Sequence, residues 1–212
     1  MKVLVGCEHT GTVRRAFRER GHQAWSCDLL PASDGETFHH YQGDVLTILD
    51  QDWDLAVFHP DCTYLTNSAA WAFTNGPYHQ KVKAGTLVGA ARRKAREQAI
   101  DFVWLLLNAP IPRIAIENPI GALSRAIGRP QQIIQPWMFG ADASKATCLW
   151  LKGLPPLEPT QIIEPRNVRG RPRWANQTDS GQNRLSPSGD RWAKRAATYP
   201  GIAAAMAEQW GG

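Results

Sequence analysis

The stretch MKVLVGCEHTGTVRRAFRERGHQAWSCD, residues 1–28, decides the fold of this chain. It opens on an apolar run that is typical of a buried strand, and it closes on a second such run over residues 23–27. Between the two runs, Val13, Ala16 and Phe17 have the spacing of the apolar stripe on a helix that packs on a sheet. The order strand, helix, strand predicts a parallel pair, and we therefore expect an α/β fold with a doubly wound, mostly parallel sheet.

The rest of the chain continues this alternation. Apolar patterns predict further strands over residues 55–58, 113–116, 132–135 and 147–151, and helices over residues 87–108 and 202–210. With 212 residues the chain is long enough for one α/β core and too short for two ordinary domains. We expect a core over residues 1–152, a basic loop-rich segment over residues 153–197, and a C-terminal helix over residues 198–212 that packs on the core.

The composition is that of a soluble globular protein, with 43% hydrophobic and 20% charged residues. No apolar run is long enough to span a bilayer, and the apolar start is too short for a signal peptide, so we expect a cytoplasmic location. The cysteines are widely spaced and form no C-x-x-C pair: Cys7, Cys27, Cys62 and Cys148. Their spacing predicts neither a metal site nor disulfide bonds.

The net charge of +5 is concentrated in the last part of the chain. From residue 165 to the end, eight basic residues stand against three acids in a stretch rich in Gly, Pro, Asn and Ser. This pattern predicts that a loop-like segment contacts nucleic-acid phosphates, and a solvated tail is the alternative. The residues expected to bind DNA are Arg166, Arg169, Arg171, Arg173 and Trp174. Two roles are open for Trp174: stacking on a displaced base, and packing.

Two short stretches place reactive side chains where predicted strands end. HPDCTYL, residues 59–65, follows the strand over residues 55–58, and IENP, residues 116–119, stands at the end of another strand. Open α/β sheets bind their ligands at this edge. A cysteine, Cys62, and a carboxylate, Glu117, delivered to one crevice suggest covalent chemistry. The alternative for Cys62 is a small buried core residue.

Asp28 closes the second predicted strand, about twenty residues after the glycine turn of residues 6–11. At this position, doubly wound folds place a carboxylate that accepts hydrogen bonds from ribose. The turn lacks the G-x-G-x-x-G pattern of dinucleotide sites, and its acidic Glu8 would repel a pyrophosphate. A ligand with a ribose and a positive centre but no phosphate fits better, and S-adenosylmethionine has these properties. Glu8 has an alternative role as a cap of the following helix.

Five motifs in a fixed order resemble those of DNA cytosine-5 methyltransferases, above all the short members that phages carry. They are Gly6-Cys7-Glu8-x-x-Gly11, Asp28, Gly43-Asp44-Val45, His59-Pro60-x-Cys62 and Glu117-Asn118-Pro119. The resemblance spans about residues 2–151. It implies a Rossmann-like class I methyltransferase core, a location in the cytoplasm of a bacterial or phage-infected cell, S-adenosylmethionine as the cofactor and DNA as the partner.

The resemblance also implies a role for each motif residue. Cys62 is the nucleophile that adds to carbon 6 of cytosine, Glu117 holds the ring nitrogen N3, and Lys145 replaces the family's arginine. Asp28 and Asp44 meet the ribose and the adenine of the cofactor. The full set expected at the cofactor is Gly6, Cys7, Glu8, Thr10, Gly11, Asp28, Leu29, Asp44, Val45, His59 and Pro60. A target base in duplex DNA has to be flipped out of the stack.

The chain departs from the family pattern at several places. Asp61 and Pro119 stand where the family has proline and valine. The space between residue 151 and the last predicted helix is too short for the usual target recognition domain, so we expect sequence specificity to be relaxed or supplied by a partner. Three alternatives stay open: the same chemistry on a free pyrimidine nucleotide, a degenerate amino-methyltransferase turn, and an inactive relative that binds DNA or cofactor. The Glu117-Asn118 pair argues against the second of these.

Overall fold

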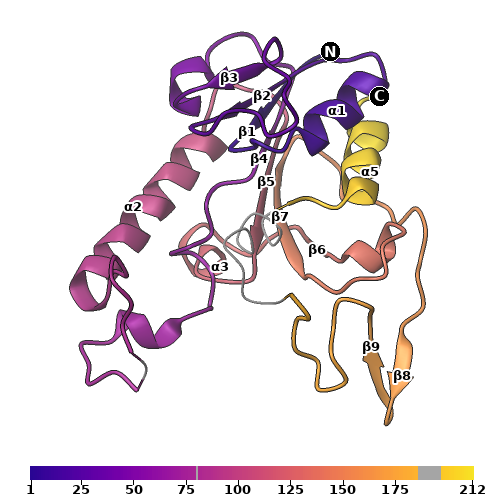
Figure 1. Cartoon of the computed structure of the whole chain (residues 1–212). Helices are drawn as coiled ribbons and strands as arrows, with labels where there is room; N and C mark the ends of the chain where they lie inside the picture. Colours follow the sequence, from indigo (N-terminus) through magenta and orange to yellow (C-terminus); the bar gives the residue numbers. More distant parts are fainter. Residues whose placement is uncertain (80, 186–196) are drawn as a thin grey trace.

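A computed structural model describes residues 1–79, 81–185 and 197–212. Its centre is a seven-stranded sheet with the strand order β3-β2-β1-β4-β5-β7-β6 (Figure 1). The strands of this sheet are β1 (Lys2–Gly6), β2 (Gln23–Asp28), β3 (His40–Gln42), β4 (Leu55–Phe58), β5 (Ile114–Pro119), β6 (Gln132–Ile134) and β7 (Thr147–Lys152). The helices are α1 (Thr12–Glu19), α2 (Gly89–Leu107), α3 (Leu123–Ala126) and α5 (Pro200–Trp210), with 3-10 helices η1 (Val45–Ile48), η2 (Ala70–Phe73) and η3 (Pro136–Met138).

The sheet is mostly parallel. β1 pairs in parallel with β2 and β4, and the parallel pairing continues to β3 on one side and to β5 on the other. β7 lies between β5 and β6 and is antiparallel to both. The doubly wound, mostly parallel α/β fold expected from the sequence is confirmed. The strand order reverses at β1, so the ligand crevice of such a sheet lies beyond the carboxyl ends of β1 and its neighbours.

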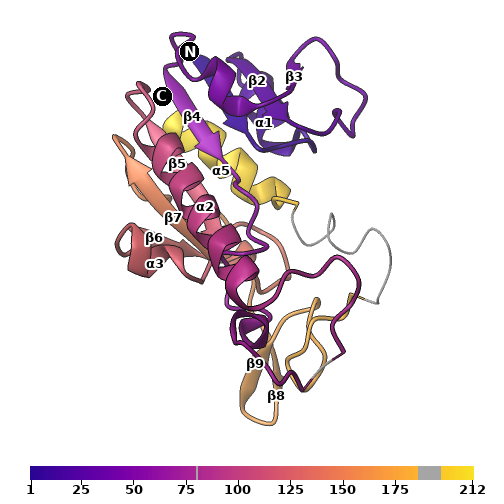
Figure 2. The same cartoon turned by 90° about the vertical axis from the view of Figure 1, so that its left-hand side faces the viewer.

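Helices cover both faces of the sheet. α1 and α5 lie together on one face, and α2 runs along the other (Figures 1 and 2). Phe17 of α1 and Trp210 of α5 pack with Val57 of β4 in one buried cluster, whereas Leu106 of α2 packs with Phe58 of the same strand in a second. Neighbouring strand residues thus enter different cores, as the two-residue period of a strand requires. Within the described ranges, no helix is long and apolar enough to cross a membrane.

The central strands are continuous buried apolar runs. All four residues of β4 are buried, as are the last four of β1, and such runs are typical of parallel strands covered on both faces. Each fully buried Val, Leu or Phe side chain contributes about 1.5–3 kcal/mol to stability. At the end of β1, a Cβ atom at Gly6 would come within 2.4 Å of the Phe58 ring. Glycine at this position therefore lets the first turn pass close to β4.

Two strands differ from the sequence prediction. The short strand β3 was not expected, because it lies at the edge of the sheet and its partly exposed residues carry no apolar pattern. β5 extends to Pro119, because its antiparallel pairing with β7 continues to Thr147. Glu117 and Asn118 therefore lie within the last part of the strand.

The basic segment, which the sequence predicts to be loop-rich, also contains a short regular element. It contains an antiparallel hairpin of β8 (Arg166–Val168) and β9 (Arg171–Arg173), which projects away from the sheet (Figure 1). Arg169 and Gly170 form its turn, and both have positive φ. Two-residue hairpin turns of type I′ have positive φ at both central positions, and glycine adopts it readily at the second.

Candidate active site

The residues that follow β4 form a tight turn, named here the cysteine turn (residues 59–65). The carbonyl oxygen of Cys62 accepts a hydrogen bond from the backbone N–H of Leu65 at 3.0 Å. One carboxylate oxygen of Asp61 accepts from the backbone N–H and the hydroxyl of Thr63, at 3.0 and 2.8 Å. These bonds fix the turn and leave Cys62 half-buried at the carboxyl edge of the sheet.

The end of β5 holds the cysteine turn from one side. The side-chain amide of Asn118 donates to the carbonyl oxygen of Pro60 at 2.8 Å, and the backbone N–H of Ala122 donates to that of Leu65 at 2.7 Å. Gly121 makes the second approach possible, because a Cβ atom there would lie 2.0 Å from the Leu65 oxygen. The two reactive stretches of the sequence are thus fastened to one another.

Helix α2 holds the same turn from the other side. Its Arg92 donates to the carbonyl oxygen of Thr63 at 3.1 Å, and its Arg96 donates to that of Tyr64 at 2.7 Å. Both guanidinium groups lie over the ring of Phe73, at 4.7 and 3.4 Å from its centroid. Sequence reasoning missed these two arginines, although their i, i+4 spacing on a predicted helix places them on one face.

His59 and Glu117 form a largely buried pair at the carboxyl ends of β4 and β5. His59 Nδ1 lies 2.9 Å from Glu117 Oε2, and the two side chains are 11% and 14% exposed. Burial lowers the pKa of His59, but the hydrogen bond and the charge of Glu117 outweigh burial and raise that pKa overall. Burial raises the pKa of Glu117, but the hydrogen bond and charge of His59, together with Lys145 and Thr147, outweigh burial and lower that pKa overall. Both shifts favour an imidazolium beside a carboxylate.

The segment before β7 completes the surroundings of Glu117. A hydrogen bond with the side chain of Thr147 and the positive charge of Lys145 both lower the pKa of Glu117. The Lys145 ammonium donates to the carbonyl oxygen of Ala197 at 3.2 Å. The structure therefore brings Lys145 to the same edge of the sheet as Cys62 and Glu117, the other two residues expected to be catalytic.

The thiol of Cys62 is protonated at rest. Burial raises its pKa, and the negative charges of Asp61 and Glu117 raise it further. The charge of Lys145 acts in the opposite direction without offsetting them. Because a thiolate is the reactive form, only a small fraction of the protein is poised for attack at neutral pH.

Removing the charge of Asp61 is expected to make this thiol more reactive. Asp61→Asn lowers the pKa of Cys62 and moves the rising limb of the pH–rate profile to lower pH, with a gain in rate of up to about tenfold at pH values below that pKa. Asparagine keeps the oxygen that Thr63 contacts, so the turn is preserved. Initial rates over a pH series measure the effect, and a limb that stays in place or moves upward contradicts it.

Two carboxylates lie at or just after the carboxyl ends of β2 and β3, where the sequence predicts a cofactor. Asp28 accepts a backbone hydrogen bond from Leu30 at 2.9 Å and Asp44 from Leu46 at 3.0 Å, each through one oxygen only. Within the described residues, the second oxygen of each carboxylate has no hydrogen-bond partner. Burial and then the charges of both aspartates raise the pKa of Cys7, which places them around the glycine turn. These groups fit a ligand with ribose hydroxyls and a positive centre, and they disfavour a phosphate.

The glycine turn itself is shaped by helix capping. Glu8 Oε1 accepts from the backbone N–H of Val13 at 2.7 Å, and Oε2 accepts from that of Arg14 at 3.3 Å. The Thr10 hydroxyl lies 3.4 Å from Glu8 Oε1, and Gly11 has a φ of 66° at the start of α1. Glu8 thus has the capping contacts that the sequence left as an alternative.

The remaining residues expected at the cofactor fall into two groups. Leu29 is 74% exposed beside Asp28, whereas Val45 is buried in the core below the glycine turn. His59 and Pro60 contact β5, through Glu117 and Asn118 respectively. The pairing of His59 with Glu117 is a contact that sequence reasoning missed.

Part of the β8–β9 hairpin's charge is used internally. Arg166 forms an ion pair with Asp179 at 2.6 Å, and Arg173 donates to the carbonyl oxygen of Asp179 at 3.0 Å. Arg169 and Arg171 line a hollow of about 510 Å³, and their side chains form no hydrogen bond or ion pair with any described residue. These two arginines are the hairpin's free charges. Three other basic residues of the segment lie outside the described part of the chain: Arg191, Lys194 and Arg195.

Trp174 follows the hairpin and stacks on Trp137 of η3. Their ring centroids are 5.7 Å apart and the planes are inclined by 18°. Of the two roles that the sequence left open, this contact favours packing.

A second basic stretch adjoins the cysteine turn. From residue 62 to residue 96 the chain has six Lys or Arg residues and no Asp or Glu. Two of the six, Arg92 and Arg96, hold the turn, while Lys81, Lys83 and Lys94 are exposed. In Figure 1 this stretch lies across from the β8–β9 hairpin. Sequence reasoning missed this basic stretch. The run of 35 residues without Asp or Glu was the pattern that could have revealed it.

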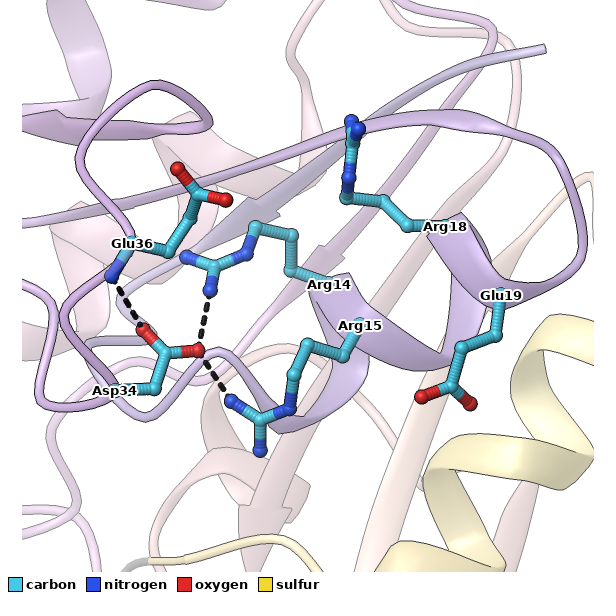
Figure 3. A pocket seen from close by; sticks show the side chains of 6 residues that line it. All are labelled: Arg14, Arg15, Arg18, Glu19, Asp34 and Glu36. Atoms are coloured by element: carbon cyan, nitrogen blue, oxygen red, sulfur yellow. Dashed lines mark hydrogen bonds and ion pairs between the residues drawn. The ribbon is translucent and has the colours of Figure 1, made fainter.

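Another charged cluster lies between α1 and the loop that follows β2. Arg14 is buried, donates to Ser26 Oγ at 2.8 Å and pairs with Asp34, which Arg15 also contacts (Figure 3). A hollow of about 450 Å³ lies beside these groups. The cluster fastens the loop between β2 and β3 to α1. In the part of the chain that the structure describes, no group of three or more His, Cys, Asp or Glu side chains could hold a metal ion.

Comparisons with known proteins reach only the level of the fold. No family model and no curated protein matches the chain. Among solved structures it is similar to an E. coli protein assigned as a DNA modification methyltransferase and encoded within a prophage, with a TM-score of 0.47 and 13% sequence identity. The match covers 80% of this chain and 53% of that one, so the chain spans about half the length of its neighbour. So distant a match assigns no role to any residue of this chain.

Proposed function

We propose that this protein transfers a methyl group from S-adenosylmethionine to carbon 5 of cytosine in DNA, through a covalent adduct of Cys62. The observation that carries the proposal is the joining of the two reactive stretches, in which Asn118 holds Pro60 at 2.8 Å and Glu117 holds His59 at 2.9 Å. A nucleophile turn and a carboxylate fixed to each other in this way can act on opposite sides of one pyrimidine ring.

Each residue has a definite task in this chemistry. The Cys62 thiolate adds to carbon 6 of the ring, which places negative charge on the ring. Glu117 faces N3 and neutralises that charge with a proton. Lys145 favours the thiolate, because its positive charge lowers the pKa of Cys62. Arg92 and Arg96 keep the cysteine turn in place through its carbonyl oxygens.

Asp28 and Asp44 would hold the cofactor through ribose hydroxyls and adenine, using the carboxylate oxygens that have no hydrogen-bond partner among the described residues. When bound, S-adenosylmethionine supplies an electrophilic methyl group to carbon 5. The acidic surroundings of Cys7 suit its positive sulfonium and amino groups.

The two basic stretches support DNA as the substrate. The exposed charges at Arg169, Arg171 and Lys81, Lys83, Lys94 lie on two separate parts of the molecule, and lysine and arginine contacts to phosphate supply most sequence-independent affinity. Among its described residues the hairpin has no helix that could fill a major groove, so contacts of Arg169 and Arg171 to phosphates fit better than contacts to base edges.

Analysis of the methylated product tests the proposal. Duplex DNA is incubated with protein and S-adenosylmethionine, digested to nucleosides and examined by mass spectrometry, with free cytidine nucleotides in a parallel reaction. We expect 5-methylcytosine from DNA and none from the free nucleotide. Methylation of the exocyclic amine would favour an amino-methyltransferase, efficient methylation of the nucleotide would replace DNA as the substrate, and binding without turnover would indicate an inactive relative.

Cofactor affinity tests the role of Asp28. Asp28→Ala removes a charge-assisted hydrogen bond worth about 1.5–3 kcal/mol and is expected to weaken S-adenosylmethionine binding roughly 10- to 150-fold. Asp28→Asn keeps the contact with Leu30 and is expected to lose less affinity. Titration calorimetry measures both variants, and unchanged affinity in both would place the cofactor elsewhere.

Salt dependence tests the role of the hairpin. The double variant Arg169→Ala, Arg171→Ala is expected to weaken binding to all duplex sequences alike and to reduce the slope of log affinity against log salt by about 0.9 for each phosphate that the hairpin no longer binds. The double variant Arg18→Ala, Arg20→Ala makes the same charge change at the C-terminal end of α1 and serves as the control. Equal slopes in both variants would show that the hairpin does not bind phosphates.

A further inference from the structure

We propose that His59 is a positioning residue that stores the proton which Glu117 delivers to N3 of the target cytosine. The inference rests on the proposed function and adds a residue to it. Two observations carry it: His59 Nδ1 lies 2.9 Å from Glu117 Oε2, and the buried Nε2 of the same ring has no hydrogen-bond partner among the described residues.

A proton is needed because N3 of cytosine is a hydrogen-bond acceptor. A bare carboxylate at that place would repel the nitrogen lone pair. The environment of Glu117 lowers its pKa and favours its ionised form, so this residue alone holds no proton at neutral pH. The pair with His59 holds one, because the same contact raises the pKa of the imidazole and favours its protonated form. Glu117 and His59 can therefore act as one unit that shares a single mobile proton.

The unpartnered Nε2 makes that proton available. A structural buried histidine has partners at both ring nitrogens, and a second acceptor would stabilise the imidazolium and hold its charge. Within the described residues Nε2 has none. Among the described residues, Glu117 is therefore the imidazolium's one hydrogen-bond partner. When the Nδ1 proton passes to the carboxylate of Glu117, the ring becomes neutral, and the cost of a buried charge with an unpartnered N–H group is removed.

The proton balance of the step is complete. The step begins from the Cys62 thiolate, whose own proton has passed to solvent. As its sulfur forms the bond to carbon 6, the proton moves from His59 Nδ1 to the carboxylate of Glu117 and on to N3, which leaves a neutral imidazole and a neutral ring adduct. After carbon 5 has received the methyl group, its hydrogen leaves as a proton to water and the electron pair of that C–H bond forms the 5,6 double bond. Cys62 then departs as the thiolate, and the N3 proton returns to the pair. No oxidant or reductant takes part, and the methyl donor of the proposed function is the one co-substrate.

Three charged groups of the described residues act on the His59 ring. Glu117 of β5 and Glu8 of the glycine turn favour its charged form, and Lys145 before β7 disfavours it. Both carboxylates of this set belong to elements that pack against the carboxyl end of β4. The ring is thus set between two acids and one base, which suits a group that gives up and regains a proton in each turnover.

The pH profile of His59→Asn tests the inference. Asparagine can donate to Glu117 from about the position of Nδ1, but it cannot titrate. In the wild type, the rate should rise with pH as the fraction of Cys62 thiolate increases. It should level off at the pH where the pair of His59 and Glu117 loses its proton, because the gain in thiolate is then balanced by the loss of that proton. In His59→Asn we expect a rate roughly 10²- to 10⁴-fold lower near neutral pH. That rate should keep rising with pH until the thiol is fully ionised.

A variant with a lower rate but an unchanged profile would show that His59 is merely structural, and it would overturn the inference while the proposed function stands. Absence of 5-methylcytosine with the wild type would overturn the proposed function itself. Should His59→Asn fail to fold, the ¹⁵N shifts of the His59 ring provide a second test. They should titrate at higher pH in the wild type than in Glu117→Gln, and equal titration in the two proteins overturns the inference.

Discussion

Cys62→Ser is expected to reduce methyl transfer on the order of 10³-fold or more, to the background rate. An alcohol is a far poorer nucleophile than a thiolate at neutral pH, and the nearby charges of Asp61 and Glu117 oppose a second anion at this position. Affinity for S-adenosylmethionine is expected to stay nearly unchanged, since the proposed cofactor contacts lie at Asp28 and Asp44. Transfer of a labelled methyl group to DNA measures the first effect, and calorimetry measures the second.

Cys148→Ala is the matched control for this substitution. Cys148 is 1% exposed in β7, and its pKa is raised by burial and by Glu117, as that of Cys62 is. Its thiol therefore shares the electrostatic surroundings of the site but lies in the core, and the control variant should keep its activity. A serine variant as active as the wild type would remove Cys62 from the mechanism.

Gly121→Ala is expected to show the second large effect. Its Cβ atom would meet the Leu65 oxygen at 2.0 Å, so the cysteine turn has to move away from β5 by roughly 1 Å or more to reach an ordinary separation. A displacement of this size at a reacting group costs about 10²-fold in rate, and the crowding costs about 1–3 kcal/mol in stability. The loss should appear in the rate of methyl transfer more than in cofactor affinity.

Gly43→Ala provides the control for this prediction. It also lies at the carboxyl edge of the sheet, but a Cβ atom there would meet nothing within 4 Å. We expect its rate and its thermal unfolding temperature to stay close to those of the wild type. If Gly121→Ala behaves in the same way, the close approach of Leu65 to residue 121 does not fix the cysteine turn.

The central part of the fold could be predicted because its sequence signal is strong. β1 and β4 are continuous apolar runs, and α1 carries a clear apolar stripe between two such strands. The edge strand β3 and the β8–β9 hairpin gave no comparable signal. They depend on backbone pairing and on the positive φ of Arg169 and Gly170, which apolar periodicity does not report.

The site shows the same division. The placement of Cys62 and Glu117 at one edge followed from their positions at the ends of strands expected to be parallel. Which side chains touch could not be predicted, because it depends on the lateral order of the strands. The pairing of His59 with Glu117 requires β4 beside β5, and the approach of Lys145 requires β7 to be inserted in antiparallel orientation. Local sequence patterns predict neither the lateral order of these strands nor the antiparallel orientation of β7.

The covalent step is the central claim, and trapping it is the most direct measurement. Duplex DNA that contains 5-fluorocytosine blocks the final elimination, since fluorine at carbon 5 cannot leave as a proton does. With S-adenosylmethionine present, the wild type and Cys148→Ala are expected to form an adduct that survives denaturation, and digestion with mass spectrometry is expected to locate the modified base on Cys62. Cys62→Ser should form none. An adduct on another residue, or none with an active wild type, would contradict the account.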